Sequence, residues 1–432
     1  MRIGRTLPPA ATPIALREIV SGICGIFHGQ QELSRFELEL KEHFGVKHCF
    51  LVSSGKAAFT LILLALHELF PDRDEVLIPA FTCYSVPSSV VRAGLRIRLC
   101  DLHPESLDFD FAQLSAMLFE GPLRQADARP IGGASESRVD NRDATDSSKD
   151  SIRRVLAIVP THLFGYPADV TILRKLVRDQ GVAIVEDAAQ AMGETIEDRK
   201  VGTLGDVGFF SLARGKAFSV VEGGVILTNR DDLAEILSPF VGRLPRYGLL
   251  PLLKLVFKAV ALMVLIHPRL FWVPRNMPSL KLGETLFETQ FPILRMSSFQ
   301  AGLARRWREK LEKLRVARKK NANRWIAILD ASRNHESCFL RAQSLGLLRF
   351  PLRVGEKKKR DTLLKESARM GLGIMSVYPT SIDAIPELSG KIEGREFPVA
   401  ERCARELVTL PTHGYLTERD VMELCRLISR VV

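Results

Sequence analysis

The chain has 432 residues, of which 46% are hydrophobic and 26% are charged, and its formal net charge is +11. This balance indicates a globular protein with room for one large and one smaller domain, and it excludes a disordered chain. The basic charge suits anionic ligands or an anionic lipid surface. Because no segment interleaves basic and aromatic residues in a recognition module, we do not expect nucleic acid as a partner.

The seven cysteines are scattered along the chain and form no CxxC pair. Their spacing therefore predicts neither a disulfide framework nor a metal site. The first 20 residues are basic and contain prolines, but they lack the continuous apolar run of a secretory signal. These features favour a reducing, cytoplasmic setting.

Short apolar runs alternate with helix-length segments from about residue 47 to residue 230. Helices are expected at 56–69 and 85–94, and strands at 48–54, 75–80, 96–102, 155–162, 182–188, 207–212 and 223–229. Alternating strands and helices with continuously apolar strands predict a largely parallel sheet covered on both faces. Ligands of such sheets gather at the carboxyl ends of the strands. The residues that follow each strand are therefore the candidates for chemistry.

Two stretches depart from this alternation. Residues 124–153 are rich in Asp, Ser, Arg and Gly and predict a mobile surface insertion. From about residue 292 the composition changes, with one long charged helix expected over 296–329 and further helices over 357–371 and 417–430. We therefore expect a large domain over 1–291 and a smaller α+β domain over 292–432.

Polar residues with complementary chemistry follow three of the predicted strands. The first strand ends in a Gly-containing turn into a helix, where exposed N–H groups favour an anion. Later strands end at a carboxylate and a hydroxyl. A phosphate cradle, a carboxylate and a lysine amine together suit pyridoxal 5′-phosphate, which needs a covalent lysine and an acid beside its ring nitrogen. The residues are Ser53, Ser54, Gly55, Lys56, Asp187, Gln190, Ser211 and Lys216.

An ordered set of segments over most of the chain resembles one family. The segments include FELELKEHFGVKHCFLVSSGKAA, DEVLIPAFT, VPTHLFGYPADV, VEDAAQAMG, KVGTLGDVGFFSL, EGGVILTN and FPVAERCARELVTLPTH. They resemble the nucleotide-sugar aminotransferases of the DegT/StrS type, which have the PLP-dependent transferase fold type I. The resemblance implies a mostly parallel central sheet covered by helices and a smaller C-terminal α+β domain.

The resemblance also implies a role for each candidate residue. Lys216 matches the lysine that forms the Schiff base with the cofactor, and Asp187 matches the acid at the pyridine nitrogen. Gln190 falls near the ring hydroxyl. Ser211, Gly55 and the backbone of Lys56 fall where the family binds the phosphate.

Four positions depart from the family pattern. Lys56 replaces the usual threonine, and its side chain is expected either to pair with the phosphate or to point into water. Cys83 stands where an aromatic ring normally stacks on the cofactor, so that Tyr84 or Phe81 is expected to cover the ring instead. Ala217 replaces an asparagine, and the segment around Tyr378 lacks the family's histidine. These changes bear on the substrate more than on the cofactor.

The resemblance implies an aminotransferase that moves an amino group from an amino acid such as glutamate to a nucleotide-linked keto sugar, for amino-sugar or surface-polysaccharide synthesis. It also implies a homodimer with shared active sites, with Arg246 at the neighbouring-subunit contact. Two alternatives stay open. One is a dehydratase of the same family, which would carry histidine in place of Lys216, and the other is a regulatory homologue without catalysis.

Residues 247–275 form the most apolar stretch of the chain. The stretch contains Lys254 and Lys258, which a helix places on one face. Three interpretations stay open: a buried or subunit-interface helix, a helix lying in the membrane interface, and a membrane span. A span would have to bury two charges. We expect peripheral contact with the cytoplasmic face of the membrane.

Overall fold

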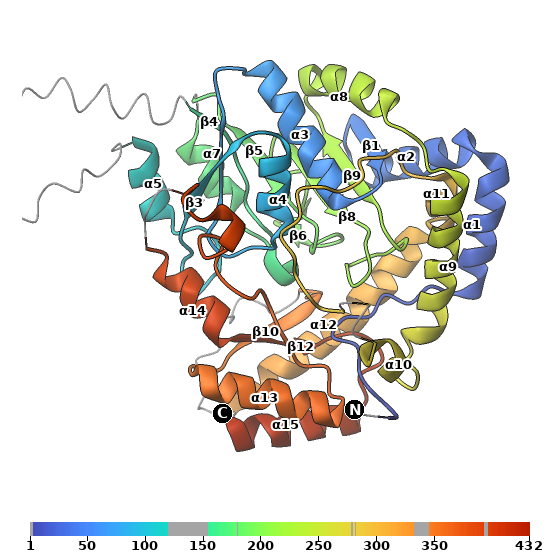
Figure 1. The fold of residues 1–432 in the computed structure, drawn as a ribbon, viewed down its shortest axis with the longest axis vertical. Helices are drawn as coiled ribbons and strands as arrows, with labels where there is room; N and C mark the ends of the chain where they lie inside the picture. Colours follow the sequence, from blue (N-terminus) through green and yellow to red (C-terminus); the bar gives the residue numbers. More distant parts are fainter. Residues whose placement is uncertain are drawn as a thin grey trace, which may run out of the picture.

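The computed structural model describes residues 3–119, 154–178, 180–277, 280, 282–331, 345–392 and 396–432. Two main sheets organise these residues (Figure 1). The larger has seven strands in the order β1-β9-β8-β5-β4-β2-β3, and the smaller has three in the order β10-β12-β11. The insertion predicted at 124–153 lies outside the described residues.

The larger sheet is mostly parallel, as predicted. Its strands are β1 (His48–Val52), β2 (Glu75–Pro79), β3 (Arg96–Cys100), β4 (Val155–Ile158), β5 (Ala183–Asp187), β8 (Val207–Ser211) and β9 (Gly224–Thr228). Only β9 runs against its neighbours β1 and β8. The loop 212–223 joins β8 directly to β9, and a connection without a crossover helix requires antiparallel strands. The carboxyl ends of the parallel strands therefore share one edge of the sheet.

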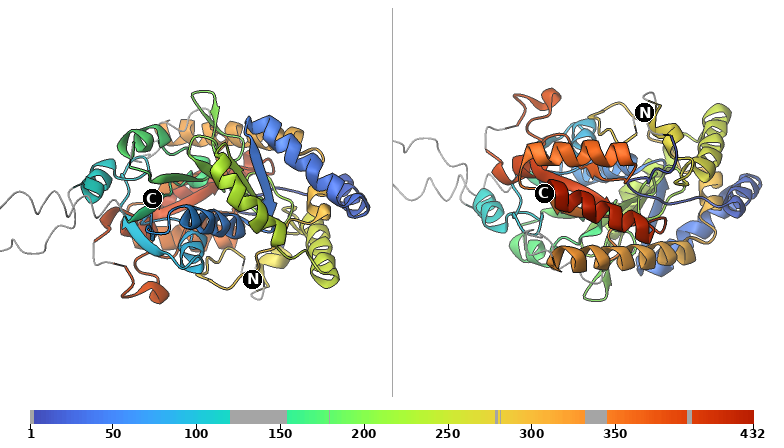
Figure 2. Two further views of the ribbon diagram at one scale, coloured as in Figure 1. Left: turned by 90° about the horizontal axis from the view of Figure 1, so that it is seen from above. Right: turned by 90° about the horizontal axis from the view of Figure 1, so that it is seen from below.

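Helices cover both faces of this sheet (Figure 2). They are α2 (Gln30–Phe44), α3 (Gly55–Leu69), α4 (Ser85–Arg92), α5 (Phe111–Phe119), α7 (Val170–Leu176), α8 (Asp231–Arg243) and α11 (Ser298–Leu303). Phe209 packs into the core that α3 shares, whereas its neighbour Phe210 packs into the core of α2 and α11. Successive side chains of a strand point to opposite faces, so both faces of β8 are buried.

The second sheet carries the C-terminal helices. Its elements are α12 (Trp307–Ala331), β10 (Arg349–Arg353), α13 (Lys357–Met370), β11 (Met375–Ser376), α14 (Pro398–Glu406), β12 (Leu407–Pro411) and α15 (Glu418–Val431). The helices predicted at 357–371 and 417–430 are confirmed. The smaller elements are the hairpin β6 (Thr195–Ile196) and β7 (Arg199–Lys200), and the 3-10 turns Leu163–Gly165 and Pro386–Leu388.

The single long helix predicted over 296–329 is wrong, because the chain breaks between α11 and α12. All six residues of α11 are intermediate or buried, and the helix packs closely on α1 (Leu16–His28). Helix α12 instead runs to the second sheet, where Trp325 Nε1 donates a hydrogen bond to Pro411 O at 3.0 Å. The two packing surfaces lie in different directions, which one straight helix cannot satisfy. The domain boundary at 291/292 remains a proposal.

Helices α1 and α9 (Leu249–Leu265) lie side by side at one edge of the molecule, with the short α10 (Trp272–Arg275) below α9 (Figures 1 and 2). Helix α9 occupies most of the apolar stretch 247–275. Among the helices in the described ranges, none is long and apolar enough to cross a membrane.

Candidate active site

The register of β1, β9 and β8 places two candidate phosphate-binding residues, Gly55 and Ser211, next to each other. Gly224 of β9 is opposite Val52 on one side and opposite Ser211 on the other. The turn after β1 therefore starts α3 directly beside Ser211. A Cβ added to Gly55 would lie 2.9 Å from Ser211 Cβ, so this contact requires glycine.

The N-terminus of α3 points its free amides into this corner. Ser54 caps the helix by accepting a hydrogen bond from Ala57 N at 3.1 Å. The amides of Gly55 and Lys56 belong to the first turn, which has no intrahelical acceptors. Together with the Ser211 hydroxyl they are able to hold an anion, as helix N-termini commonly do.

The side chain of Lys56 turns away from this corner. Its Nζ donates to Glu288 at 2.9 Å and lies 4.4 Å from the centre of the Phe291 ring. Neither predicted orientation, toward a phosphate or into open water, describes it. The reason is a partner that sequence spacing does not reveal, since the segment 284–296 folds back over α3 and β1.

The adjacent acids Glu186 and Asp187 have different surroundings. Glu186 is fully buried, pairs with His162 at 3.0 Å and accepts hydrogen bonds from backbone amides of the 202–205 turn, including Gly202 N at 2.9 Å. It holds the turn before β8. Asp187 is 5% exposed and accepts a hydrogen bond from Ala189 N at 3.1 Å.

The surroundings of Asp187 favour a nearby positive charge. Burial raises the pKa of Asp187, and the positive charge of Lys216 acts in the opposite direction. Lys216 is close enough to Asp187 for its charge to affect the carboxylate, although the two side chains form no direct ion pair. Within the described ranges, the side-chain amine of Lys216 has no hydrogen-bond partner.

The loop that carries Lys216 is anchored through its backbone. Thr12 Oγ1 donates to Lys216 O at 2.6 Å, and Arg318 Nη1 donates to Ala217 O at 2.9 Å. Arg318 is 2% exposed, and burial lowers its pKa to about 10. Sequence reasoning missed Arg318, because it is one of many basic residues in α12 and nothing marks it as the buried one.

The same loop contains a strained residue. Val221 has a φ of 80°, which β-branched residues rarely adopt. Its amide donates a hydrogen bond to Ser219 Oγ at 3.1 Å. Strain of this kind concentrates at functional loops that the surrounding fold holds in place. The loop 212–223 is therefore held by specific contacts on both sides of Lys216.

Tyr378, from the segment after β11, completes the site near Asp187. Gln190 Nε2 donates to the Tyr378 hydroxyl at 3.2 Å, and Phe81 packs against the Tyr378 ring with centroids 5.2 Å apart. Burial raises the pKa of Tyr378 well above its usual value, so the phenol stays protonated. The sequence contained one indication of Tyr378, because a tyrosine followed by a proline stands in the segment where the family's histidine is missing.

Cys83 and Tyr84 point to different neighbours. The Tyr84 hydroxyl lies 2.6 Å from Thr380 Oγ1 and accepts a hydrogen bond from Thr380 N at 3.0 Å. Tyr84 therefore ties the turn after β2 to the segment after β11. Cys83 is half-buried and influences the pKa values of Tyr378 and Arg349. Its thiol accepts a hydrogen bond from Ser85 Oγ at 3.1 Å. The predicted stacking role of Tyr84 stays a prediction.

Arg349 is a further cation that sequence reasoning missed. It is the first residue of β10, and burial lowers its pKa while Tyr378 and Cys83 act in the opposite direction. Its Nε is buried without a hydrogen-bond partner, and Nη1 reaches only the Met375 sulfur at 4.0 Å. Within the part of the chain that the structure describes, no carboxylate pairs with this guanidinium. The sequence could have indicated Arg349 only through its position at the start of an apolar strand.

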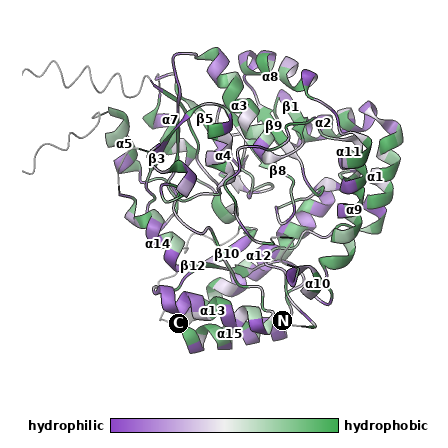
Figure 3. Ribbon diagram, in the orientation of Figure 1, coloured by the Kyte–Doolittle hydropathy of each residue, from purple (hydrophilic) through white to green (hydrophobic). Residues whose placement is uncertain are grey.

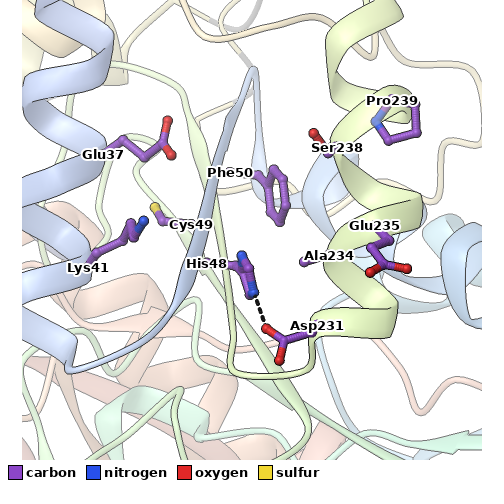
Figure 4. A pocket seen from close by; sticks show the side chains of 10 residues that line it. All are labelled: Glu37, Lys41, His48, Cys49, Phe50, Asp231, Ala234, Glu235, Ser238 and Pro239. Carbon is purple, nitrogen blue, oxygen red and sulfur yellow. Dashed lines mark hydrogen bonds and ion pairs between the residues drawn. The ribbon is translucent and has the colours of Figure 1, made fainter.

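A groove of about 700 Å³ lies elsewhere, between α2 and α8 (Figure 4). His48, which bonds Asp231 at 2.7 Å, stands at the amino end of β1 in this groove. The candidate site begins at the other end of the same strand, about 13 Å away. The groove contains none of the candidate residues and has no part in the chemistry discussed below.

The donor set fits pyridoxal 5′-phosphate. A glycine-lined helix N-terminus beside a hydroxyl suits the phosphate, and a buried carboxylate without a cationic hydrogen-bond partner suits the ring nitrogen. An amine within the field of that carboxylate suits the covalent attachment. The groups come from the ends of β1, β5 and β8, which the parallel sheet brings to one edge.

Comparison with known proteins agrees with this geometry. The sequence model of the DegT/DnrJ/EryC1/StrS aminotransferase family matches residues 17–120, 147–248 and 291–429. The chain belongs to this family, whose members depend on pyridoxal 5′-phosphate. Its fold is the PLP-dependent transferase fold type I, as the sequence predicted.

Three relatives illustrate the range of similarity. The chain is 25% identical over 407 residues to a GDP-perosamine synthase of Caulobacter vibrioides, covering 92% of this chain and 89% of that one. Helicobacter pylori PseC, an aminotransferase of pseudoaminic acid biosynthesis, has a similar structure with a TM-score of 0.72 and 15% identity, covering 99% of both chains. The E. coli GDP-4-keto-6-deoxy-D-mannose-3-dehydratase with bound hydrated PLP has a TM-score of 0.70 and 16% identity, covering 99% of this chain and 100% of that one.

Proposed function

We propose that this protein is a PLP-dependent aminotransferase that moves an amino group from an amino acid to the keto carbon of a nucleotide-linked sugar, for amino-sugar and surface-polysaccharide synthesis. The observation that carries the proposal is the convergence of Lys216, Asp187 and the Gly55–Ser211 corner at one edge of the sheet. The GDP-perosamine synthase relative, which covers most of both chains, supports a sugar nucleotide as acceptor.

Lys216 has two tasks in this proposal. Its Nζ would attach the cofactor covalently. As a free amine, Nζ would take the proton from the donor Cα in the first half of the reaction and deliver a proton to the former keto carbon of the sugar in the second half. An amine without a competing hydrogen bond, held by Thr12 and Arg318 through the loop backbone, suits this general acid–base work. The cofactor itself supplies an electron sink for the carbanion.

Asp187 and the corner at α3 hold the cofactor. The Asp187 carboxylate would bind the ring nitrogen and keep it protonated, because its buried charge lacks a cationic partner otherwise. Ser211 and the amides of Gly55 and Lys56 would bind the phosphate. Gln190 donates to the Tyr378 phenol, so that the two side chains form one polar group beside the ring.

The donor is an amino acid whose carboxylate binds Arg349. Arg349 is partly buried, with its Nε shielded from solvent, and it lacks an acidic partner among the described residues. It lies with Tyr378 near the candidate catalytic groups. The carboxylate of an amino acid is one bond from the reacting Cα, whereas the diphosphate of a sugar nucleotide lies beyond a whole hexose ring. An unpaired arginine this close to Gln190 and Tyr378 therefore suits the donor better than the diphosphate.

A homodimer with shared active sites and a cytoplasmic position at the membrane face complete the proposal. Arg246 is exposed beside the start of α9, where a neighbouring subunit would reach it. Among the described cysteines, Cys24, Cys49, Cys83 and Cys425 are free thiols, which suits a reducing compartment. Peripheral contact of 247–275 with the membrane is supported by the exposure of α9.

A turnover assay tests the proposed function. The purified holoenzyme is given glutamate or glutamine with a panel of nucleotide keto sugars, and the products are separated and weighed by mass spectrometry. An amino sugar with the nucleotide attached is the expected product. A deoxy sugar without added nitrogen would identify a dehydratase instead, and no product from any pair would favour the regulatory homologue.

A further inference from the structure

Helices α1 and α9 expose a continuous apolar surface, which we call the α1–α9 face. On α1 the outermost side chain is Phe27, 85% exposed, and on α9 it is Phe257, 74% exposed. The two helices contact each other, and much of both ribbons has the hydrophobic colour in Figure 3. The exposed members are Leu16, Val20, Ile23, Ile26 and Phe27 on α1, and Leu249, Leu250, Leu253, Phe257, Val260 and Val264 on α9.

Each helix presents these residues as one stripe. Most of the exposed apolar positions recur three or four residues apart, a spacing that keeps them on one side of a helix. They are 16, 20, 23, 26 and 27 on α1 and 250, 253, 257, 260 and 264 on α9. The opposite sides are fixed by packing. On α1, a Cβ at Gly25 would lie 2.6 Å from Ser298 O, so the helix sits directly against the backbone of α11. On α9, Leu255 and Ala259 are buried. The outward direction of both stripes is therefore set by the fold.

The family comparison separates α9 from the catalytic framework. The family model matches residues 147–248 and resumes at 291, so the segment with α9 and α10 lies outside the matched ranges. Only Leu255 and Ala259 of α9 are buried, so most of this apolar helix stays at the surface. Exposed apolar patches of this extent mark a contact with a membrane or another protein.

The charges around the face favour a lipid surface. Residues 243–275 contain no aspartate or glutamate, while Arg17, Lys254, Arg269 and Arg275 are exposed at the margins. Two acids beside these helices are paired: Glu18 on α1 is buried against Lys310 at 2.6 Å, and Glu222 pairs with Lys258 of α9 at 3.1 Å. The α1–α9 face therefore combines apolar side chains with unopposed positive charge.

This combination of apolar side chains and positive charge favours an anionic bilayer over a second copy of the chain as the binding partner. A second copy of the chain, docked face to face, would bring Arg17 and Lys254 toward the same cations of its partner without acids to pair with them. An anionic bilayer offers acyl chains to the apolar stripes and phosphates to the cations. We propose that the α1–α9 face binds an anionic lipid bilayer, with both helices lying in the plane of the interface. Phe27 and Phe257 then enter the acyl region, and Lys254 extends to the head groups.

Vesicle flotation of the full-length holoenzyme tests the proposal. The vesicles are phosphatidylcholine alone, or phosphatidylcholine with about one third phosphatidylglycerol, whose head groups supply the negative surface potential. The wild-type protein is expected to float with the anionic vesicles and to be released by high salt. Phe27→Glu with Phe257→Glu is expected to lower the bound fraction more than tenfold, because two aromatic side chains leave the acyl region. Lys254→Ala is expected to lower affinity for anionic vesicles about fivefold.

Two control variants test whether the effect is specific to the α1–α9 face and separate from catalysis. Val316→Glu replaces an exposed valine on α12, away from the face, and is expected to float like the wild type. Lys216→Ala is expected to float unchanged, so that failure of the proposed catalysis and failure of membrane binding remain separate. Cofactor absorbance and thermal melting check that each variant other than Lys216→Ala is folded and loaded.

Three results would overturn the membrane proposal. They are absence of the wild type from the anionic vesicle fraction, equal flotation of the Phe27/Phe257 double variant, and a double variant that loses its oligomeric state in light scattering. The last result would assign the face to a second copy of the chain.

Discussion

Replacing Asp187 by asparagine separates its electrostatic role from its structural one. Asparagine has nearly the same shape, and its amide oxygen can still accept the hydrogen bond from Ala189 N that Asp187 accepts at 3.1 Å. The substitution therefore removes the charge while leaving the local backbone bonded. In the proposed mechanism, this charge keeps the ring nitrogen of the cofactor protonated.

The expected loss follows from the strength of a single charge pair. Two opposite unit charges about 4 Å apart contribute about 4 kcal/mol at an effective dielectric constant near 20. Because about 1.4 kcal/mol corresponds to a tenfold change in rate, Asp187→Asn is expected to lower kcat by roughly a thousandfold. Single-turnover measurement of the donor half-reaction, followed by cofactor absorbance, gives this rate without the sugar substrate.

The stability of the cofactor-free protein should change in the opposite direction. Burial raises the folded-state pKa of Asp187, so the folded carboxyl holds its proton more tightly than the unfolded one. The ionised carboxylate thus destabilises the cofactor-free fold at neutral pH, and this penalty disappears as the pH falls through the raised pKa. We expect the Tm of cofactor-free Asp187→Asn to equal or exceed that of the wild type at neutral pH, with a difference that shrinks in acid. A variant with unchanged kcat, or one that loses both activity and stability, would refute this reasoning.

Three further predictions concern the groups around the site. Borohydride reduction of the holoenzyme should fix the cofactor to Lys216, and Lys216→Ala should abolish transamination with the fold intact; an adduct mapped to any other lysine would contradict the assignment. Arg349→Leu should raise the KM for the amino donor more than tenfold and weaken binding of an unreactive α-methyl amino acid, with Arg349→Lys between the two; a rise confined to the KM for the sugar nucleotide would place the diphosphate there instead. Arg318→Met should destabilise the protein by about 3 kcal/mol in denaturant titration, because buried carbonyls lose a charged donor, and should lower kcat by displacing the lysine loop; stability loss with normal kcat would limit Arg318 to a structural role.

The predicted membrane stretch shows how far sequence pattern reaches. Its hydropathy indicated a helix, and α9 forms there. Hydropathy left a buried or subunit-interface helix, a membrane-interface helix and a span open. The exposed stripe on α9 contradicts burial within this chain, and the helix is not long and apolar enough for a span. Exposure of this stripe depends on which side of α9 packs against the rest of the protein, and that is a property of the tertiary structure.

The sequence by itself determined the parallel sheet and one half of the site. Strand and helix formation follow local periodicity, and parallel strands necessarily bring their carboxyl ends to one edge. Gly55, Asp187, Ser211 and Lys216 could therefore be placed together from their positions after strands. Their joint presence then identified the cofactor chemistry.

Only the tertiary structure decided the other half. Tyr378 and Arg349 come from the second sheet and its following segment, and Arg318 comes from α12. Local sequence patterns do not predict which side chains of these elements lie near the carboxyl ends of the large-sheet strands. Lys56 illustrates the same limit, because its partner Glu288 belongs to a segment that returns over α3 from far along the chain. Contacts between distant segments depend on how the layers pack, since each segment's own periodicity is equally satisfied in many arrangements. The framework was thus readable from short-range pattern, whereas the neighbours of each catalytic group were set by long-range packing.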